Sequence, residues 1–412
     1  MIVRSLRLYN FRNYVTQEIE LPSGLIALTG DNGQGKTNLL EALCVLATTK
    51  SPLVERDREL IRWHEKEARI AAEVELAARR GERRMLEYGW RMEGVSVARE
   101  MRAGGVPQSA IVQWLGQLQV VAFFPHDLVL ITGEPGERRR FLNLELGKTR
   151  PAHFADAARY RRALQQRNAL LRSLMESRFN RHRTAPLGAA VEGLGTLSEW
   201  NRQLITYGSR ILAQRAQFLT ELQPLLQEAY GKLSGRDDVF SVEYLPGIKT
   251  GKQALGAEEA AHVSWSQLFS VSLEGDHDHD MRRGTTQSGP HRDDLVFKLG
   301  TMDLRRYGSQ GQQRLAVLAL KVALAHWVAR VTQEPPILLL DDALSELDAT
   351  RRTRLLEEAA CFPQSVLTAT DAKFLQGVPA TLFSVSNGCI AGGAGTEIEQ
   401  NMDNSATMVE QL

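Results

Sequence analysis

Three short segments, far apart in the chain, constrain this sequence more than any other feature. GDNGQGKT occupies 30–37, SQGQQ occupies 309–313 and ILLLDDALSELD occupies 337–348. The first matches the phosphate-loop pattern GxxxxGK[ST], with a strand-like apolar stretch before it and a helical pattern after it. At average glycine usage, a chance match in a chain this long should occur about once in a hundred sequences. We therefore predict an α/β fold built around a nucleotide-binding loop.

The phosphate loop assigns roles to individual residues. Its glycines let backbone N–H groups turn inward around phosphate oxygens, and the next helix points its positive end at the same phosphates. Lys36 would supply a positive charge for the β- and γ-phosphates, and the Thr37 hydroxyl would bind Mg²⁺. The residues expected to bind ATP here are Gly30, Asp31, Asn32, Gly33, Gln34, Gly35, Lys36 and Thr37.

Two carboxylates follow the apolar run 337–340, which has the pattern of a buried parallel strand. Asp341 is the expected Mg²⁺ ligand, directly or through water. Asp342 would orient or deprotonate the attacking water, so Asp342 and Lys36 are the expected catalytic residues. Taken without the phosphate loop, the two carboxylates could also be an acidic turn after a core strand, although the Mg²⁺ site is favoured.

The segment SQGQQ opens a long, almost wholly apolar helical stretch at 313–331. A serine hydroxyl and exposed N–H groups at a helix start make a second anion site, formed by Ser309, Gly311 and Gln312. Read alone, the same residues are an N-cap serine followed by a flexible glycine. The position of the segment, shortly before the strand that ends in Asp341, favours the anion site.

The order of these motifs resembles that of the ATP-binding-cassette ATPases, specifically their SMC-like branch. The resemblance implies that two chains dimerise head to tail around two ATP molecules, with Ser309 on the γ-phosphate bound by the other chain. The loop 345–348 would then cross the dimer interface. This chain has Asp342 where the family usually has glutamate, and Thr370 and Asp371 where a histidine often stands. Both departures predict slow hydrolysis, suited to a switch.

Further segments resemble the RecF family of bacterial recombination mediators. They are LRLYNFRNY at 6–14, FPHDLVLITGEPGERRRFL at 124–142, YRRALQQRNALL at 160–171, GPHRDDL at 289–295 and LLLDDALSELDATRR at 338–352. The resemblance implies binding to duplex DNA and to single-strand/double-strand junctions at gaps. It also implies RecR, RecO and RecA as partners in recombinational repair and the SOS response. For 290–294 two interpretations stay open: a charged turn that pairs internally, or a group at the nucleotide or subunit interface.

Local charge gives an argument independent of the resemblance. The whole chain has a net charge of +1, but 138–183 hold thirteen Lys or Arg residues against three carboxylates, a local net of +10. Arginine pairs phosphate oxygens through its planar fork. We expect DNA-backbone contacts from Arg138, Arg139, Arg140, Arg159, Arg161 and Arg162. The alternative is a solvated helical face.

The expected architecture is an ATP-binding-cassette head, with a mixed sheet, flanking helices and an antiparallel β subdomain, plus an inserted helical lobe. Residues 1–118 and 281–388 would form the two parts of the ATPase lobe and 119–280 the arginine-rich lobe, with 389–412 a disordered tail. The polar stretch 274–288 is expected to be a loop. Gln117 and Gln119 are candidates for the glutamine that senses the γ-phosphate.

Composition excludes several classes of protein. Hydrophobic residues make up 43% and charged residues 24%, which is ordinary for a globular chain. Cys44, Cys361 and Cys389 have no paired spacing, which argues against disulfides and zinc and favours the reducing cytoplasm. Arginines interrupt the N-terminal segment in the region where a signal peptide would be apolar. The sequence has no uninterrupted run of 18 apolar residues, so no membrane span is predicted.

Three alternative functions share part of this motif pattern. A transporter's ATP-binding subunit keeps its phosphate loop and signature roughly 100 residues apart by resemblance, whereas Lys36 and Ser309 are 273 positions apart. A chromosome-organising SMC protein would need hundreds of residues of heptads in the insert. A non-catalytic DNA-binding module that uses ATP only to hold two chains together stays open because of Asp342.

Overall fold

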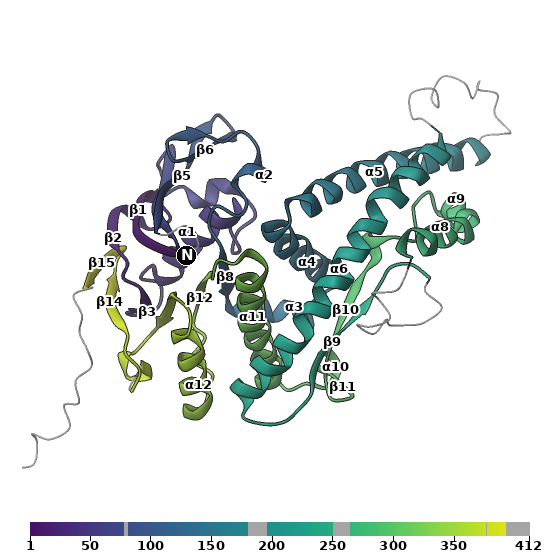
Figure 1. Ribbon diagram of the computed structural model, residues 1–412. Helices are drawn as coiled ribbons and strands as arrows, with labels where there is room; N and C mark the ends of the chain where they lie inside the picture. The colour runs from purple at the N-terminus through teal and green to yellow at the C-terminus, as the bar shows by residue number, and fades with distance from the viewer. Residues whose placement is uncertain (78–80, 180–195, 250–263, 376, 393–412) are drawn as a thin grey trace, which may run out of the picture. The chain divides into compact units, whose positions relative to one another are not determined.

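The computed structural model describes residues 1–77, 81–179, 196–249, 264–375 and 377–392 (Figure 1). Contacts divide the chain into two compact units. Unit 1 comprises Met1–Ser109, Gln117–Pro125 and the chain from Gln333 onward, and unit 2 comprises Ala110–Gly116 and His126–Thr332. This division differs from the expected lobes in grouping 281–332 with the helical residues, and in placing 110–116 in unit 2 and 119–125 in unit 1. The expected lobe boundaries, at 118/119 and 280/281, therefore stay a prediction.

A mixed six-stranded sheet forms the centre of unit 1, in the order β15-β14-β3-β13-β12-β8. Its parallel strands are β3 (Gly24–Thr29), β8 (Val120–Phe123), β12 (Ile337–Leu340), β13 (Gln364–Ala369) and β14 (Thr381–Ser386). Every residue of β12 and β13 is buried, as their continuous apolar character predicts. Helices α1 (Lys36–Thr48) and α12 (Ala349–Ala360) pack against this sheet.

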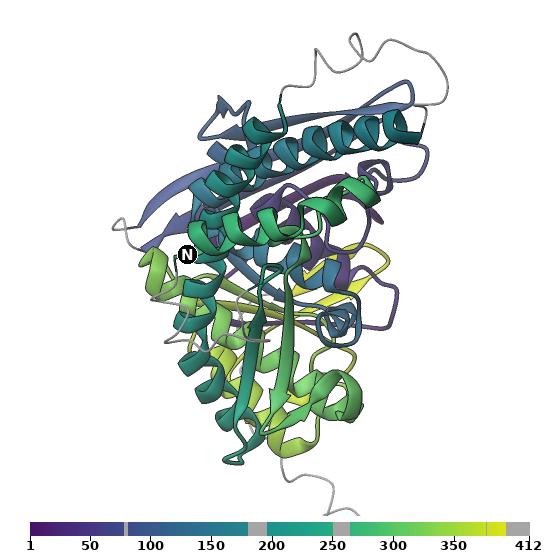
Figure 2. The same cartoon turned by 90° about the vertical axis from the view of Figure 1, so that its right-hand side faces the viewer.

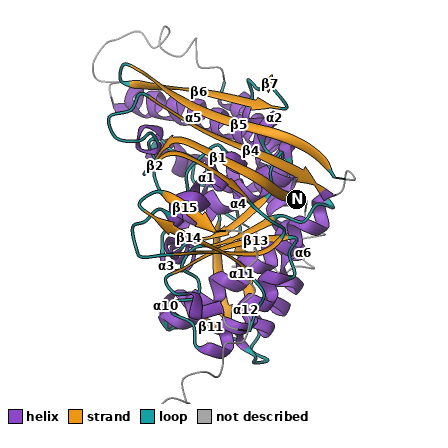
Figure 3. Cartoon of the chain, turned by 90° about the vertical axis from the view of Figure 1, so that its left-hand side faces the viewer, coloured by secondary structure: helices purple, strands orange, loops and turns teal. Residues whose placement is uncertain are grey.

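A second, antiparallel sheet of unit 1 has the order β2-β1-β4-β5-β6-β7 (Figure 3). Its strands are β1 (Ile2–Phe11), β2 (Tyr14–Glu20), β4 (Glu67–Leu76), β5 (Glu82–Glu93), β6 (Ser96–Ala103) and β7 (Val106–Pro107). Alternation in β4 and β5 buries Ile70, Val74, Tyr88 and Trp90 on one face. Helix α1 contacts β4 and β5 of this sheet and β8 and β13 of the other, so it lies between the two. The expected antiparallel β subdomain is confirmed.

Unit 2 is mainly helical, as expected (Figure 2). Its helices are α2 (Ile111–Trp114), α3 (Val129–Thr132), α4 (Pro135–Thr149), α5 (Pro151–Phe179), α6 (Leu197–Ser234), α8 (Trp265–Gly275), α9 (His277–Arg283), α10 (Leu304–Tyr307) and α11 (Gln310–Thr332). A small antiparallel sheet joins β9 (Phe240–Leu245), β10 (Asp294–Leu299) and β11 (Met302–Asp303). Short 3₁₀ turns cover Asp57–Leu60 and Ala372–Leu375 in unit 1, Pro290–Arg292 in unit 2, and Pro125–Leu128 where the chain passes from unit 1 to unit 2.

Helix α11 explains why 281–332 belong to unit 2. It packs along α6, where the Trp327 ring meets Phe218 edge to face with ring centroids 4.7 Å apart. Among the described helices, α11 passes a length-and-hydropathy test for crossing a membrane, but 72% of the tested window is buried inside the protein. A core helix passes the same test, so the result is weak evidence for a membrane span.

Two local expectations were wrong. Part of the expected loop 274–288 is helix α9, because its polar residues face inward: Asp280 forms an ion pair with Arg167 at 2.7 Å, and neither side chain has exposed surface. The expected disordered tail begins with strand β15 (Cys389–Gly392), paired antiparallel with β14. Asn387 and Gly388 join these strands with positive φ at both positions, as in a type I′ hairpin turn. Residues 393–412 lie outside the described part of the chain.

Candidate functional site

The phosphate loop of unit 1 joins the end of β3 to the start of α1, as its sequence predicts. Gly35 has φ of 119°, and a Cβ there would lie 2.7 Å from Asn13 Nδ2, so only glycine fits. Asn13 Nδ2 donates to the Gln34 carbonyl at 2.8 Å, and the Tyr14 hydroxyl donates to the Gly35 carbonyl at 2.9 Å. The turn between β1 and β2 therefore fixes the loop's backbone from one side.

The hairpin turn between β14 and β15 braces the same loop from another direction. The N–H of Gly388 donates to the Gln34 carbonyl at 3.1 Å, and the N–H of Asn387 donates to Gln34 Oε1 at 2.7 Å. Motif spacing gave no sign of these contacts. Asn13 and Tyr14 did end a segment that carried the family resemblance, and Asn-Gly is a recognisable hairpin signal.

Lys36 begins α1 and turns back over its own loop. Its ammonium donates to the carbonyl oxygens of Gly30 and, at 2.8 Å, of Asp31. Burial lowers the pKa of Lys36, while the neighbouring carboxylates of Asp341, Asp31 and Asp342 act to raise it. A cation held over the loop in this way can exchange carbonyl contacts for phosphate oxygens without a large movement of its backbone.

Thr37 and Asp341 meet although 304 positions separate them. The Thr37 hydroxyl donates to Asp341 Oδ1 at 2.9 Å, and the Thr368 hydroxyl on β13 donates to the same oxygen at 2.9 Å. Asp341 follows β12 and is 5% exposed. Its burial raises the pKa of the carboxyl, and the two hydroxyl hydrogen bonds oppose that shift. A nearly buried carboxylate beside a threonine hydroxyl is an oxygen-donor set suited to Mg²⁺.

Asp342 adopts a left-handed backbone conformation, with φ of 47°. Its N–H donates to the Thr368 hydroxyl at 2.8 Å, and its carbonyl accepts from the Ser345 hydroxyl at 3.2 Å. Aspartate tolerates positive φ better than most residues because its short polar side chain can bond locally. This conformation gives a local reason for aspartate where glutamate is usual.

A pocket of about 360 Å³ lies over the loop and gathers many of the expected residues. It is lined by Asn32, Gly33, Gly35, Lys36, Thr37, Asn38, Pro125, Asp341, Asp342, Thr368, Ala369 and Thr370. The carboxyl ends of the parallel strands converge here, which is where open α/β sheets bind ligands. Thr370, one of the two residues that stand where a histidine is common in ATP-binding-cassette ATPases, is among the lining residues.

The two glutamines proposed as γ-phosphate sensors do not line this pocket, so that expectation is corrected. Gln117 and Gln119 precede β8, whereas Pro125, soon after the other end of β8, reaches the pocket. Gln117 Oε1 instead accepts from Arg84 Nη1 at 2.5 Å, and the Gln119 carbonyl accepts from the Ile337 N–H at 2.9 Å.

Ser309 stands at the start of α11 in unit 2 and is exposed, as are Gln310 and Gly311. The N–H of Gln312 donates to the Ser309 hydroxyl at 3.3 Å, and the N–H of Ser309 donates to Gln312 Oε1 at 2.9 Å. This reciprocal pair is a capping box, so the N-cap interpretation is confirmed. Exposure of the residues leaves the anion-site interpretation open.

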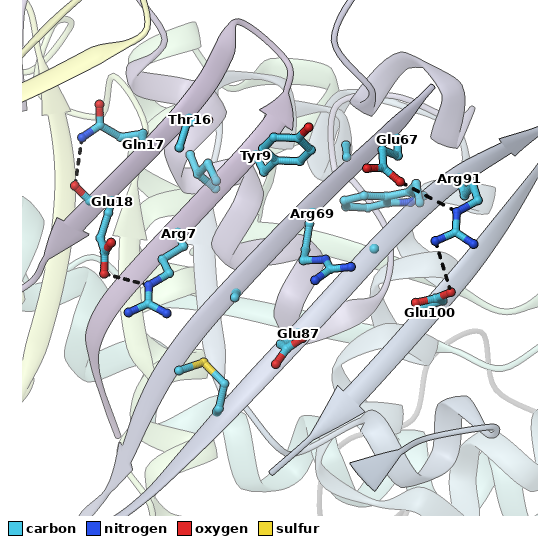
Figure 4. A pocket seen from close by; sticks show the side chains of 16 residues that line it. Arg7, Tyr9, Thr16, Gln17, Glu18, Glu67, Arg69, Glu87, Arg91 and Glu100 are labelled. Atoms are coloured by element: carbon cyan, nitrogen blue, oxygen red, sulfur yellow. Dashed lines mark hydrogen bonds and ion pairs between the residues drawn. The ribbon is translucent and has the colours of Figure 1, made fainter. Parts of the chain in front are cut away.

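A larger hollow, of about 510 Å³, lies on the outer face of the antiparallel sheet (Figure 4). Gly89 and Ala71 leave space on neighbouring strands, and the ion pairs Arg7–Glu18 and Arg91–Glu67 stand around it. None of its lining residues belongs to the phosphate loop or follows β12. It is therefore separate from the candidate nucleotide pocket.

Comparisons with known proteins agree with this arrangement. Residues 2–387 match the family model described as "RecF/RecN/SMC N terminal domain". The "DNA replication and repair protein RecF" of Thermomicrobium roseum is 40% identical over 388 residues, covering 91% of this chain and 95% of the relative. This chain belongs to the RecF family. The RecF protein of Streptococcus gordonii is 34% identical over 392 residues, covering 95% of this chain and all of the relative.

Solved structures place the fold in the same family. The chain is similar to one titled "Structure of the recombination mediator protein RecF-ATP in RecFOR pathway", with a TM-score of 0.80 and 27% identity over 95% of this chain and 97% of that one. An Smc head domain from Pyrococcus furiosus has a TM-score of 0.52 at 16% identity, which shows a shared fold alone. The ATP-binding-cassette fold is confirmed, and RecF relatives matched along nearly their whole length leave the transporter interpretation without support.

The six arginines expected to contact DNA in this RecF-family chain divide into two groups by their burial. Arg138 is 2% exposed, and its Nε and Nη2 donate to the two carboxylate oxygens of Asp294, at 2.5 and 3.1 Å, so a DNA contact is no longer proposed for it. Arg139 is partly buried and donates to the Asp293 carbonyl at 2.9 Å. The remaining four, Arg140, Arg159, Arg161 and Arg162, are exposed.

The segment 290–294, which is specific to the RecF resemblance, pairs internally. Asp293 is fully buried, forms an ion pair with Arg215 and accepts from the Tyr244 hydroxyl and, at 2.7 Å, from the Gly247 N–H. His291 Nδ1 lies 2.7 Å from the Tyr160 hydroxyl. Of the two interpretations left open by the sequence, the structure therefore supports the internal one for these side chains.

Proposed function

We propose that this chain is an ATP-dependent DNA-binding clamp of recombinational repair, which closes as a head-to-tail dimer when it binds ATP. The observation that carries the proposal is the hydrogen bond from the Thr37 hydroxyl to Asp341 Oδ1, at 2.9 Å. It lies beside a phosphate loop that also contains Lys36. RecF relatives carry the name "DNA replication and repair protein", and the similar solved structures are titled with ATP or its analogue in the RecFOR pathway.

ATP and Mg²⁺ fit the residues present. Thr37 Oγ1 and the Asp341 carboxylate would hold the ion, and loop N–H groups from Gly33 to Lys36 would cradle the phosphates. When bound, the ion would neutralise negative charge on the phosphates. Thr368 holds the Asp341 carboxylate in place from β13, and the Lys36 ammonium would exchange its contacts with the Gly30 and Asp31 carbonyls for phosphate oxygens.

Hydrolysis would depend on Asp342. Its carboxylate is the group at this strand end that would orient or deprotonate an attacking water. An aspartate reaches less far than the glutamate usual in ATP-binding-cassette ATPases, so we propose a weak, DNA-dependent ATPase that acts as a switch. ATP then shifts the population between open monomers and the closed dimer.

The signature of one chain would complete the site of the other. Ser309 and Gly311 are exposed at the start of α11, and no Cβ at Gly311 would meet another atom within 4 Å. A phosphate group can therefore approach the Ser309 hydroxyl and the first N–H groups of a 23-residue helix. We propose that Ser309, Gly311 and Gln312 contact the γ-phosphate bound by the partner chain.

DNA would meet the exposed arginines of unit 2 through its phosphate backbone. Arg159, Arg161 and Arg162 are exposed on α5, and Arg140 is exposed on α4. Such contacts read backbone and shape rather than sequence, which suits duplexes and gap junctions. Replacing Arg159, Arg161 and Arg162 by alanine should weaken DNA binding and reduce the salt slope by about two to three. An unchanged slope would mean that this face is merely solvated.

The RecFOR titles of the similar structures support RecR and RecO as partners. RecA loading during the SOS response is proposed from the resemblance to the RecF family alone. Cys44, Cys361 and Cys389, all within the described part of the chain, form no disulfide, which suits a reducing cytoplasm. We propose a cytoplasmic protein on these grounds.

Sedimentation with and without ATP and gapped DNA tests the clamp directly. The wild-type chain should be monomeric without nucleotide and dimeric with ATP. Lys36→Met should abolish both ATP binding and dimerisation. Ser309→Arg should preserve ATP binding by the monomer but block the dimer. Dimerisation of the Lys36→Met variant at wild-type strength would sink the composite-site model, and loss of ATP binding in Ser309→Arg would place the signature at its own chain's site.

A further inference from the structure

The short helix α10, immediately before the signature, presents three exposed side chains: Arg305, Arg306 and Tyr307. Tyr307 is 71% exposed, and among the described aromatic residues only Trp63, at 85%, is more exposed. Aromatic and arginine side chains are the two kinds most enriched at the energetic centres of protein interfaces. An exposed tyrosine next to two arginines is therefore the composition expected of a surface that binds another protein.

Helix α10 is held rigidly beside Ser309. Gln313 Nε2 donates to the Leu304 carbonyl at 2.8 Å, which ties α11 to the start of α10. A Cβ at Gly308 would lie 2.6 Å from the same carbonyl oxygen, so the backbone between α10 and α11 leaves no room for a side chain at this position. Because Tyr307 and Ser309 are two residues apart, their Cα atoms are at most about 7.6 Å apart. A partner seated on the Ser309 hydroxyl would therefore also contact α10.

Few interactions hold the two arginines in place. Arg306 has one ion pair, to Asp303 at 3.8 Å, and its side chain is 74% exposed. Arg305 pairs with Glu134 at 3.3 Å, where both side chains are exposed. Exposed ion pairs of this kind contribute between zero and about 1 kcal/mol to stability. Both arginines could therefore leave these pairs at little cost to bind carboxylates of another chain.

The edge of unit 1 that carries the phosphate loop has the complementary charge. Asp31, Glu346 and Asp371 are exposed there, in the segments that follow β3, β12 and β13. Because these strands are parallel neighbours, the segments after them share one edge of the sheet. The ion pair of Asp371 with Lys373, at 3.8 Å, is as loose as that of Arg306. We call these three carboxylates the acidic rim.

We propose that Arg305, Arg306 and Tyr307 of one chain dock on the acidic rim of a second copy of this chain. The inference rests on the head-to-tail dimer of the proposed function and names the side chains that set its register. Opposite charges steer the two surfaces together and fix their relative position. Tyr307 supplies the apolar contact between them, at the boundary of the composite ATP site.

Charge reversal tests this surface. The assay measures the Kd of the MgATP-dependent dimer by sedimentation, with ATP binding by the monomer measured in parallel. Arg306→Glu and Tyr307→Ala should each weaken dimerisation about tenfold and leave ATP binding unchanged. Arg202→Glu is a matched control, because Arg202 is 75% exposed on α6 and has a comparable surface ion pair with Glu199. That control should dimerise like the wild type.

Second-site reversal then identifies the acceptor. Asp371→Arg or Glu346→Arg, combined with Arg306→Glu in one chain, should recover most of the lost dimerisation if these groups meet across the interface. Loss in the single variants without recovery in either combination would overturn the acidic rim as the acceptor and point to the partner's nucleotide phosphates. Wild-type dimerisation in both Arg306→Glu and Tyr307→Ala would overturn the surface altogether. A wild-type chain that stays monomeric with ATP would instead refute the proposed function.

Discussion

At the scale of single residues, burial separates side chains that hold the fold from those that can bind a ligand. Arg138 and Arg140 lie two positions apart in one basic run, yet Arg138 is buried against Asp294 and Arg140 is exposed. Local charge alone predicted DNA-backbone contacts for both arginines. Sequence cannot make this distinction, because the deciding partner, Asp294, lies on a strand 156 positions away.

Arg138→Ala should therefore lower stability and spare DNA binding. The change leaves the Asp294 carboxylate without its bidentate partner, and breaking such a pair costs about 3 kcal/mol. Arg140→Ala is the matched control, because the Arg140 side chain is 73% exposed and should leave stability unchanged. Urea denaturation measures the first effect and DNA titration of the folded protein the second. Loss of DNA binding with normal stability in Arg138→Ala would restore the original assignment.

His153 gives unit 2 a sensitivity to acid. It is fully buried, and burial lowers its pKa to about 4 from an ordinary value of 6.5. Since the folded state disfavours the protonated ring, stability is unaffected above pH 6.5 and falls as the pH drops from 6.5 toward 4. At pH 5 the cost should be about 2 kcal/mol. His153→Gln should be less stable at pH 7 but lose less stability between pH 7 and pH 5, as measured by urea denaturation. An equal loss in both proteins would contradict this.

At the scale of elements, the nucleotide pocket is assembled from segments that span nearly the whole described chain. The phosphate loop, the two strand-end carboxylates and their strands were all predictable, because each has a periodic or motif signal of its own. The braces from Asn13, Tyr14 and the turn at 387–388 were not, because hydrogen bonds between distant loops leave no local pattern. Helix α9 was missed for a similar reason, since its buried carboxylate is paired with a distant arginine.

Gly388→Ala should weaken ATP binding from a position 352 residues beyond Lys36. Gly388 has φ of 72°, and a Cβ there would lie 2.6 Å from the Asn13 carbonyl oxygen, so the turn must move away from the loop it braces. Gly94→Ala is the matched control, because Gly94 has φ of 64° with no atom within 4 Å of its Cβ position. Both changes should cost about 1 kcal/mol of backbone strain, but only Gly388→Ala should also weaken ATP binding, by about tenfold. Equal ATP affinity in the two variants would mean that the brace does not shape the loop.

At the scale of the whole molecule, two of the three ATP motifs belong to different compact units: the phosphate loop to unit 1 and the signature to unit 2. The sequence predicted both motifs but grouped the signature with the ATPase lobe, because it could not show that α11 packs along α6. A signature exposed on its own unit suits a contact made with another chain. Closure of the dimer would then be set by ATP, and its lifetime by hydrolysis.

Asp342→Asn should trap that closed dimer. Asparagine keeps the size of the side chain and tolerates the left-handed backbone at φ of 47°, so the strand end should keep its shape. It cannot accept a proton from water, so ATP should still bind and drive dimerisation, while hydrolysis should fall by about a hundredfold or more. Dimers formed on gapped DNA should then outlast wild-type dimers by a similar factor after free ATP is removed, as followed by fluorescence energy transfer between labelled chains. If both dimers dissociate equally fast, ATP serves only to hold the chains together, and hydrolysis at Asp342 does not time their release.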